Sequence, residues 1–470
     1  MSEPDQRLPA VPHQGRRFRA FSARHLDELG QRAGLSRSER LAVRAVATVL
    51  PFRVNSYVLD NLIDWPAAPD DPIYRLVFPQ PDMLPERDVA LLASLLARNA
   101  PAGEVQAAAH QVRLRLNPHP AGQLVLNIPR QLGEPLPGVQ HKYRETVLIF
   151  PKQGQTCHAY CTYCFRWAQF VGEPDLKMAT SSTGQIIAYL RDHTEVRYVL
   201  ITGGDPMIMG AGVLRRYVEP LLDPALGHIQ AIRIGSKSLA YWPQRFVTDP
   251  DADDTLRLFE QVTAAGRSLA FMAHFSHPRE LEPPLVAQAV SRIQAAGAVI
   301  RTQAPLIKSI NDHPRTWATM WERQVRMRMV PYYMFVERDT GPQGYFAVPL
   351  ARGCQIFRDA LSSVSGLART VREPSMSATP GKVSVDGVAE IAGQKVFVLH
   401  MIQARDPGLA GKPFFADWDP AAIWLTDLRP AFADRFPFEV PAPVTVTGLR
   451  PAARMLPAAA AGAGSSPVVA

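Results

Sequence analysis

Cysteine is scarce in this chain, since its 470 residues contain only four. That number is too small for the disulfide framework of a secreted domain. Three of the four, Cys157, Cys161 and Cys164, lie close together in the sequence. Because thiolates are soft metal ligands, this concentration indicates metal binding rather than disulfide cross-linking.

The sequence also lacks a run of about 18 uncharged apolar residues, which excludes an ordinary transmembrane helix. Its N-terminus, MSEPDQRLPA, has neither the basic start nor the apolar core of a secretory signal peptide. We therefore expect a cytoplasmic protein with no membrane partner.

Motifs for nucleic-acid binding are missing as well, although the formal net charge is +8. The arginines are scattered among acidic residues, and no DNA- or RNA-binding signature accompanies them. We expect small molecules rather than nucleic acid as partners. With 47% hydrophobic and 20% charged residues, the composition is that of an ordinary globular protein with a full core.

Composition and periodicity divide the chain into five segments. Residues 1–35, rich in Arg, Gln and Pro, are predicted to be flexible, and 441–470 is a low-complexity tail. Amphipathic stretches such as RDVALLASLLARN predict a helical cap over 36–128, with a short strand pair near its end, at 112–127. A main domain over 140–350 and a small C-terminal extension over 351–440 complete the expected organisation.

Six apolar, β-rich runs alternate with helical stretches through the main domain. This alternation predicts an α/β fold with a parallel sheet, and six units predict an open, partial (βα)6 barrel resembling a TIM barrel. In such barrels the chemistry takes place where the strands end. The runs are TVLIFPK (146–152), YVLITGG (198–204), AIRIGSK (231–237), SLAFMAHF (268–275), AVIRTQAPLI (298–307) and RMVPYYMF (328–335).

The first run leads directly into GQTCHAYCTYCFRW, so three thiols share one βα loop with the spacing CxxxCxxC. Thiolates bind iron–sulfur clusters or zinc, and a fourth cysteine normally completes either site. The remaining one, Cys354 in ARGCQIF, lies far along the chain and is interpreted as a buried apolar residue. We expect Cys157, Cys161 and Cys164 to hold three corners of a [4Fe-4S] cluster. A three-cysteine zinc site or inert buried thiols are the alternatives.

Three cysteine ligands leave one iron of the cluster open. In radical S-adenosylmethionine (SAM) enzymes, whose signature this spacing resembles, the amino and carboxylate groups of SAM occupy that position. The resemblance implies an iron–sulfur enzyme of the radical SAM type, with SAM as its second cofactor.

The second run ends in ITGGDP, where Gly203 and Gly204 allow a ligand to approach the backbone and Asp205 offers an acceptor for an ammonium group. A GGD alone is more often a turn. One βα unit after the cysteine loop, it resembles the strand end with which radical SAM barrels bind the amino group of SAM. Later strand ends supply further candidates for contacts to SAM or substrate, each with a structural alternative such as an ion pair: Arg233, Ser236, His274, His277 and Gln303.

Eight segments, in order, resemble successive motifs of the lysine 2,3-aminomutase family, over roughly residues 50–400. That family uses a 5′-deoxyadenosyl radical to abstract hydrogen from an amino acid held as an imine on pyridoxal phosphate (PLP). The resemblance implies cluster binding by the three cysteines and places Arg166 at the arginine that grips the substrate carboxylate. The segments are LPFRVNSYVLDNLID, HKYRETVLIF, CHAYCTYCFRW, VLITGGDP, RIGSKSLAYWPQRF, HFSHPREL, AGAVIRTQAPLIKSINDHP and RMVPYYMF.

Two features that serve PLP in the family are missing here. The aminomutases carry the Schiff-base lysine in a segment resembling DAPGGGGK, whereas LARTVREPSMSATPGKVSV runs directly to a later PGK motif. Lys382 therefore aligns with the later lysine, and Thr146 stands where the family has an arginine for the PLP phosphate. These departures make PLP doubtful as a cofactor and predict a divergent, aminomutase-like enzyme that acts without it.

The substrate is also expected to differ. Where the lysine-specific enzyme ends PYYIYQCD in aspartate, this chain reads PYYMFVER and has Arg338. Since arginine prefers an anionic partner, a carboxylate-bearing substrate is favoured over free lysine if Arg338 faces the pocket. Glu337 or Asp339 would take the aspartate's role after a small shift of register.

The leading hypothesis is a radical SAM enzyme that abstracts hydrogen from an amino acid or related small metabolite, with Arg166 and Arg338 contacting the substrate. Such an enzyme needs a reducing electron donor, and by family analogy it forms a homo-oligomer. One alternative is a 2,3-aminomutase, an isomerase that moves an amino group, which still uses PLP through another lysine or without a Schiff base. A second is a non-catalytic iron–sulfur or zinc scaffold.

Overall fold

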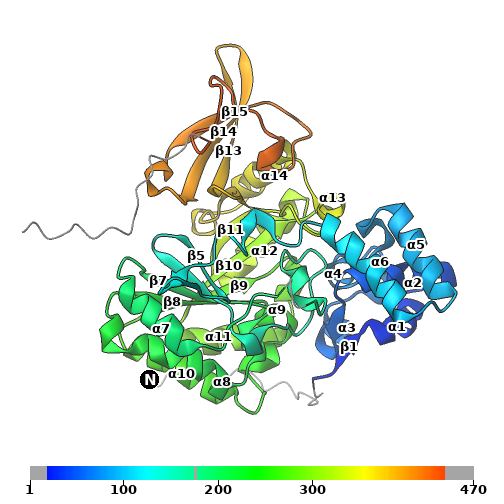
Figure 1. The fold of residues 1–470 in the computed structure, drawn as a ribbon, viewed down its shortest axis with the longest axis horizontal. Helices are drawn as coiled ribbons and strands as arrows, with labels where there is room; N and C mark the ends of the chain where they lie inside the picture. The colour runs from blue at the N-terminus through cyan, green and yellow to red at the C-terminus, as the bar shows by residue number, and fades with distance from the viewer. Residues whose placement is uncertain (1–17, 174–176, 440–470) are drawn as a thin grey trace, which may run out of the picture.

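The computed structural model describes residues 18–173 and 177–439 (Figure 1). Residues 1–17 of the segment predicted to be flexible, and the whole predicted tail 441–470, lie outside the described residues. The rest of that N-terminal segment contains strand β1 (Ala20–Ser22), paired with β2 (Arg53–Asn55), and helix α1 (Leu26–Arg32). None of the described helices combines the length and the low polarity that crossing a bilayer requires.

Six helices form a group beside the sheet, on the right of Figure 1. A capping box starts α2, because the Ser36 hydroxyl accepts from the Glu39 amide at 3.3 Å and the Glu39 carboxylate accepts from the Ser36 amide at 2.7 Å. Since α6 runs to Arg115 and only turns and a short 3-10 helix (Pro120–Gly122) follow as far as residue 127, the predicted strand pair at 112–127 is wrong. The helices after α1 are α2 (Arg37–Val49), α3 (Ser56–Asn61), α4 (Pro72–Val77), α5 (Glu86–Ala97) and α6 (Ala102–Arg115).

One sheet of eleven strands organises the rest of the chain, in the order β15-β14-β13-β12-β11-β10-β9-β8-β7-β6-β5. The six runs identified in the sequence are β6 to β11, and each strand pairs in parallel with the next. The predicted open (βα) barrel of the α/β class is confirmed, and the edge strands of the sheet do not pair with each other among the described residues. The strands from β5 to β12 are β5 (Val139–Tyr143), β6 (Thr146–Ile149), β7 (Tyr198–Ile201), β8 (Ala231–Ser236), β9 (Ser268–His274), β10 (Val299–Leu306), β11 (Val330–Val336) and β12 (Arg372–Ser377).

The two faces of the parallel strands have different neighbours. On β7, Val199 and Ile201 are completely buried in the main core, whereas Leu200 between them faces an interior cavity. Because successive side chains of a strand point to opposite faces, alternate residues of the same strand pack into the core and line the cavity. Figure 1 shows α7, α8 and α10 along the outside of the strands. The helices here are α7 (Thr183–Asp192), α8 (Ala211–Val218), α9 (Ser238–Tyr241), α10 (Ala252–Ala264), α11 (Pro284–Ala295), α12 (Pro314–Arg326), α13 (Gln343–Phe346) and α14 (Leu350–Ser362).

Three antiparallel strands extend the sheet beyond β12 and rise above the barrel in Figure 1, in orange. They are β13 (Gly381–Ile391), β14 (Gln394–Ala404) and β15 (Pro413–Asp417). Together with α14 they enclose a second apolar core that includes Phe397, Leu399 and Trp424. Cys354 belongs to this core and is 3% exposed, as expected of a buried apolar residue.

Candidate functional site

A cavity of about 320 Å³ lies within the parallel strands. Alternate residues of the strands line it, for example Leu200 and Thr202 at the end of β7 and Arg233 and Gly235 on β8. Several polar members of this lining, including Asp205 and His274, lie towards the carboxyl ends of the strands, where βα barrels carry their chemistry. Except for His277, the cavity brings together the residues predicted to bind cluster, SAM or substrate: Cys157, Cys161, Cys164, Arg166, Gly203, Gly204, Asp205, Arg233, Ser236, His274, Gln303 and Arg338.

The cysteine loop follows β6, and the N-terminal helical region holds it from the outside. The amide of Tyr160 donates to the Arg53 carbonyl at 2.8 Å, and the amide of Thr162 donates to the Leu76 carbonyl at 2.9 Å. The Thr162 hydroxyl donates in turn to the Arg75 carbonyl at 2.7 Å. These contacts fix the path of the loop through its own backbone.

The three thiols line the cavity instead of packing into either apolar core as fully buried groups. Burial raises the pKa of all three, to about 12 for Cys164, so metal binding must displace their protons. Within the described residues, no three Cys, His, Asp or Glu side chains converge on a position for one metal ion. An iron–sulfur cube does not need such convergence, because each thiolate binds a different iron. The donor set fits three corners of a [4Fe-4S] cluster.

The GGD segment at the end of β7 packs against the cysteine loop. The amide of Gly204 donates to the Gly154 carbonyl at 3.0 Å, and the amide of Asp205 donates to the Thr156 carbonyl at 2.7 Å. A Cβ atom on Gly204 would overlap the backbone of Thr156, so no larger residue fits there without displacing the loop. Gly203 has φ of +148°, a backbone conformation that favours glycine. The two glycines thus bring the strand end close to the loop backbone.

Asp205 joins the ends of β7 and β8. Its carboxylate accepts from the Ser236 hydroxyl at 2.7 Å, from the Met207 amide at 2.9 Å and from the Lys237 amide at 2.9 Å. Burial raises the pKa of Asp205, and the hydrogen bond from Ser236 opposes that shift. These donors take up most of the acceptor capacity of the carboxylate. Asp205 and Ser236 therefore orient the GGD segment, and their direct contact with SAM stays a prediction.

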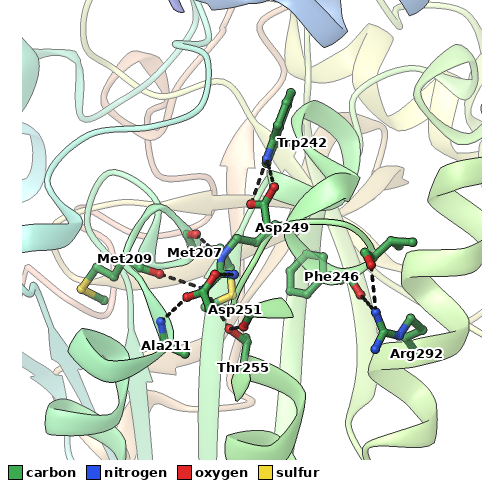
Figure 2. A network of polar contacts seen from close by, with 11 residues as sticks. Met207, Met209, Ala211, Trp242, Phe246, Asp249, Asp251, Thr255 and Arg292 are labelled. Carbon is green, nitrogen blue, oxygen red and sulfur yellow. Dashed lines mark hydrogen bonds and ion pairs between the residues drawn. The ribbon is translucent and has the colours of Figure 1, made fainter. Parts of the chain in front are cut away.

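A buried arginine that the sequence analysis did not single out fixes the segment after GGD. Arg245, 3% exposed, donates to the carbonyls of Met207 at 2.9 Å and Met209 at 3.0 Å, and to Asp251 at 2.8 Å. Asp251 also accepts from the amide of Ala211 at 2.6 Å, so the network reaches the start of α8 (Figure 2). Arg245 lies in the quoted motif RIGSKSLAYWPQRF, which was the one available signal for it.

Two arginines flank the ring of Phe165 on the cavity wall. The guanidinium carbon of Arg166 lies 5.0 Å from the ring centroid, and that of Arg338 lies 5.1 Å from it. Arg166 donates to the Gly203 carbonyl at 3.3 Å, whereas the Nε and Nη2 atoms of Arg338 are buried without a hydrogen-bond partner among the described residues. Arg338 does face the pocket, and the pair presents guanidinium groups suited to a carboxylate.

The acidic neighbours of Arg338 differ in position. Glu337 lines the cavity and is 5% exposed, and burial raises the pKa of its carboxyl group well above its usual value. Asp339 is not part of the cavity lining, and its main-chain carbonyl accepts a hydrogen bond from the Asn117 side chain at 2.5 Å. Of the two acids weighed for the aspartate's role, Glu337 has the position for it.

Two further lysines, neither of which was predicted as a site residue, also line the cavity. Lys142, near the end of β5, donates to the Ala378 carbonyl, and burial together with Arg405 lowers its pKa to about 6. Lys382, at the start of β13, lies 4.3 Å from the centroid of the Tyr333 ring. Burial and Arg233 lower the pKa of Lys382 to about 7.

Three further polar side chains of the wall, Lys237, Gln303 and His274, have partners within the protein. Lys237 forms an ion pair with Glu280 at 2.8 Å, which neutralises its charge. Gln303 and His274 make a hydrogen bond of 2.7 Å, and burial lowers the pKa of His274 to about 3, so its ring is neutral. His277 lies outside the cavity lining, where its Nδ1 accepts from a backbone amide.

Comparison with known proteins adds relatives by sequence, although no protein-family model matches the chain. A protein of Aquifex aeolicus named "Putative L-lysine 2,3-aminomutase" is 30% identical over 397 residues, which cover 84% of this chain and 92% of that protein. The L-lysine 2,3-aminomutase of Clostridium subterminale is 27% identical over 58% of this chain and 62% of its own length. The glutamate 2,3-aminomutase of Clostridioides difficile is 26% identical over 45% of this chain and 47% of its own length. Among solved structures, Streptococcus suis SuiB bound to the precursor peptide SuiA aligns with a TM-score of 0.34 and 12% identity, over 47% of this chain and 46% of that one.

Proposed function

The chain belongs to the lysine 2,3-aminomutase family of radical SAM enzymes, and we propose that it cleaves SAM to a 5′-deoxyadenosyl radical. The radical abstracts hydrogen from an amino acid or a related small metabolite. The observation that carries the proposal is one cavity lined by the CxxxCxxC thiols, the GGD segment and the two arginines beside Phe165. When bound, the [4Fe-4S] cluster supplies the electron for the cleavage, which it takes from a reducing partner.

The residues of the cavity divide the remaining tasks. Cys157, Cys161 and Cys164 hold three irons and leave the fourth open to the amino and carboxylate groups of SAM. The contact between Gly204 and the cysteine loop keeps the strand end next to the cluster. Arg166 binds the substrate carboxylate, since a planar guanidinium makes two parallel hydrogen bonds to it. Apolar side chains, including Leu148, Leu200, Met272 and Phe335, keep water away from the reacting groups.

The proposed reaction does not use PLP, because the Schiff-base segment and the phosphate-binding arginine of the family are missing from the sequence. A PLP-dependent 2,3-aminomutase is the second candidate, and one observation favours it. Lys142 and Lys382 both line the cavity, with pKa values lowered to about 6 and about 7. A lysine amine that is largely neutral near pH 7 is able to condense with an aldehyde.

Anaerobic reconstitution with iron and sulfide, followed by dithionite and SAM, tests the proposal. Formation of 5′-deoxyadenosine, measured by chromatography and mass spectrometry, is the expected result. Cys161→Ala should abolish both cluster binding and the product, while Cys354→Ala, the matched variant outside the cavity, should keep them. A cluster-replete wild-type protein that yields no 5′-deoxyadenosine would leave a non-catalytic metal-binding scaffold.

Borohydride reduction in the presence of PLP separates the two candidate functions. If the enzyme acts without PLP, 5′-deoxyadenosine forms equally with and without added PLP, and peptide mass spectrometry finds no modified lysine. Reduction that attaches PLP to Lys142 or Lys382, together with activity that requires PLP, would establish the aminomutase instead.

A further inference from the structure

The cavity wall carries more basic side chains than acids that could pair with them. Five cationic side chains line it besides the paired Lys237, and only one of them, Arg338, has a carboxylate oxygen within 4.0 Å among the described residues. Two acids line the cavity: Asp205 is bonded to protein donors, and Glu337 is buried beside Arg338. The five cations are Lys142, Arg166, Arg233, Arg338 and Lys382.

These cations form two groups. Arg166 and Arg338 flank Phe165 next to the cysteine loop. Lys382 and Arg233 form the other group, since Arg233 contributes to the lowered pKa of Lys382, whose ammonium group lies over the Tyr333 ring. Lys142 is close to both groups, because Arg338 and Lys382 each contribute to its lowered pKa. The cavity therefore has a second cationic region distinct from the arginine pair.

The second region forms where distant parts of the sheet come together. Lys142 belongs to β5, which is one edge of the sheet, whereas Lys382 lies at the start of β13, eight strands further along the order. The hydrogen bond from Lys142 to the Ala378 carbonyl joins the two across the open side of the barrel. A pair of lysines brought together in this way is held by the fold and not by an acidic partner.

A lysine amine without an anionic partner gives up its proton more easily in a buried site, and the pKa values of Lys142 and Lys382 are lowered for this reason. A bound anion would raise both pKa values and hold the two groups in their charged form. The ammonium group of Lys382 lies over the rings of Tyr333 and Phe335 and makes no hydrogen bond to another described residue. Arg233 likewise lacks an ion pair within the part of the chain that the structure describes. No described carboxylate therefore supports the alternative that Arg233 forms a structural ion pair. An anionic ligand group would supply the missing partner for each of them.

We propose that Lys142, Lys382 and Arg233 form a subsite for a second anionic group of the substrate. The substrate class is then an amino acid or related metabolite with two acidic groups, one bound by Arg166 and Arg338 and the other by the lysine subsite. The second group is a carboxylate or a phosphate monoester, which this set of donors would bind in the same way. The inference rests on the proposed function for the identity of the site as a substrate pocket.

Isothermal titration of the reconstituted full-length protein with matched pairs of probes tests the subsite. L-Glutamate and L-glutamine differ in one charge at nearly the same shape, and O-phospho-L-serine and L-serine provide the phosphate arm. The expected result is that one or both anionic probes bind at least about tenfold more tightly than their neutral partners, as a charge-assisted hydrogen bond implies. Which pair shows the preference identifies the second group. Equal affinity within both pairs would overturn the proposal.

Variants locate the effect. Lys142→Met and Lys382→Met keep most of the side-chain volume and should each remove about tenfold of the preference for the anionic probe. Lys412→Met, at an exposed lysine before β15, is the matched control and should leave it unchanged. A preference that survives both cavity variants would place the anion elsewhere and refute the subsite. If a variant fails to fold, the comparison of probes in the wild-type protein still decides.

A third pair of probes tests the competing source of a phosphate. Pyridoxine 5′-phosphate and pyridoxine share the ring of PLP but lack its aldehyde. If pyridoxine phosphate binds through Lys142 and Lys382 while neither amino acid pair shows a preference, the region holds a cofactor phosphate and the substrate subsite is wrong. Binding is measured without SAM cleavage, so a protein that prefers the anionic probe but makes no 5′-deoxyadenosine would refute the proposed function and not the subsite.

Discussion

Replacing Gly204 with alanine should separate the cysteine loop from the end of β7. The added Cβ would overlap the backbone of Thr156, and no side-chain rotation relieves a clash between backbone atoms. Overpacking of this kind costs about 1–3 kcal/mol. The displacement also breaks two hydrogen bonds, from Gly204 to Gly154 at 3.0 Å and from Asp205 to Thr156 at 2.7 Å, worth about 1 kcal/mol each. We expect a total loss of about 3–5 kcal/mol in the free energy of unfolding.

Urea denaturation and iron analysis measure the two consequences of Gly204→Ala. Reconstituted protein should hold less iron than wild type, because the loop that carries the cysteines has moved. Gly212→Ala is the control, since a Cβ at this helical position meets no atom within 4 Å. If Gly204→Ala is as stable and binds as much iron as Gly212→Ala, then the close approach of Gly204 to Thr156 does not determine the position of the cysteine loop.

Three further outcomes test other parts of the structure. Arg245→Met should lower the free energy of unfolding by about 3–5 kcal/mol, since it removes the hydrogen bonds of a buried guanidinium to two carbonyls and to the partly exposed Asp251 carboxylate. Arg257→Met at an exposed helical site should change little, and similar denaturation midpoints for the two variants would contradict this. The lowered pKa of Lys382, caused by burial and then by Arg233, means that the unfolded chain binds more protons than the native protein between pH 7 and about 10. Stability should therefore rise with pH across that window, and Lys382→Met should flatten the rise; an unchanged slope would count against it. Arg338→Met should weaken L-glutamate and L-glutamine alike by about tenfold in titration calorimetry, because it contacts the carboxylate that both share, and a loss confined to glutamate would place Arg338 at the second anionic group.

The parallel strands were predictable because each is a short, β-rich run with apolar residues on both faces. AVIRTQAPLI, for example, contains the whole of β10. The antiparallel extension also has a pattern in the sequence, namely two β-rich runs on either side of a short turn. These runs, KVSVDGVAEI and QKVFVLHMIQA, form β13 and β14. The strand pair at 112–127 failed for a physical reason. Val125 is 81% exposed and Leu126 is 52% exposed, so local β propensity found no partner strand or core to stabilise it.

The three cysteines and the GGD segment could be assigned to one cavity because each motif is contiguous in the sequence, and their roles towards a cluster and SAM stay predictions. Lys142 could not be assigned, since it belongs to an antiparallel edge strand and reaches the cavity only where β5 meets the segment after β12. Arg245 was missed for a similar reason, because its partners are backbone carbonyls whose positions only the fold defines. The direct contacts of Gln303, Arg233 and Ser236 with SAM or substrate stay predictions.

The cysteine loop of the proposed metal site donates hydrogen bonds to the carbonyls of Arg53, Arg75 and Leu76. These residues lie outside the barrel, in the helical region that precedes it. A ligand that binds only the ordered form of the cysteine loop also favours the docked form of those helices, by mass action. Loss of the cluster through oxidation would then loosen the docking of residues 52–78 against the barrel. Amide hydrogen exchange in residues 52–78 should therefore be faster in the cluster-free protein than in the loaded protein. Exchange in α10, on the outside of the barrel, should change less, so the difference would report the state of the iron site.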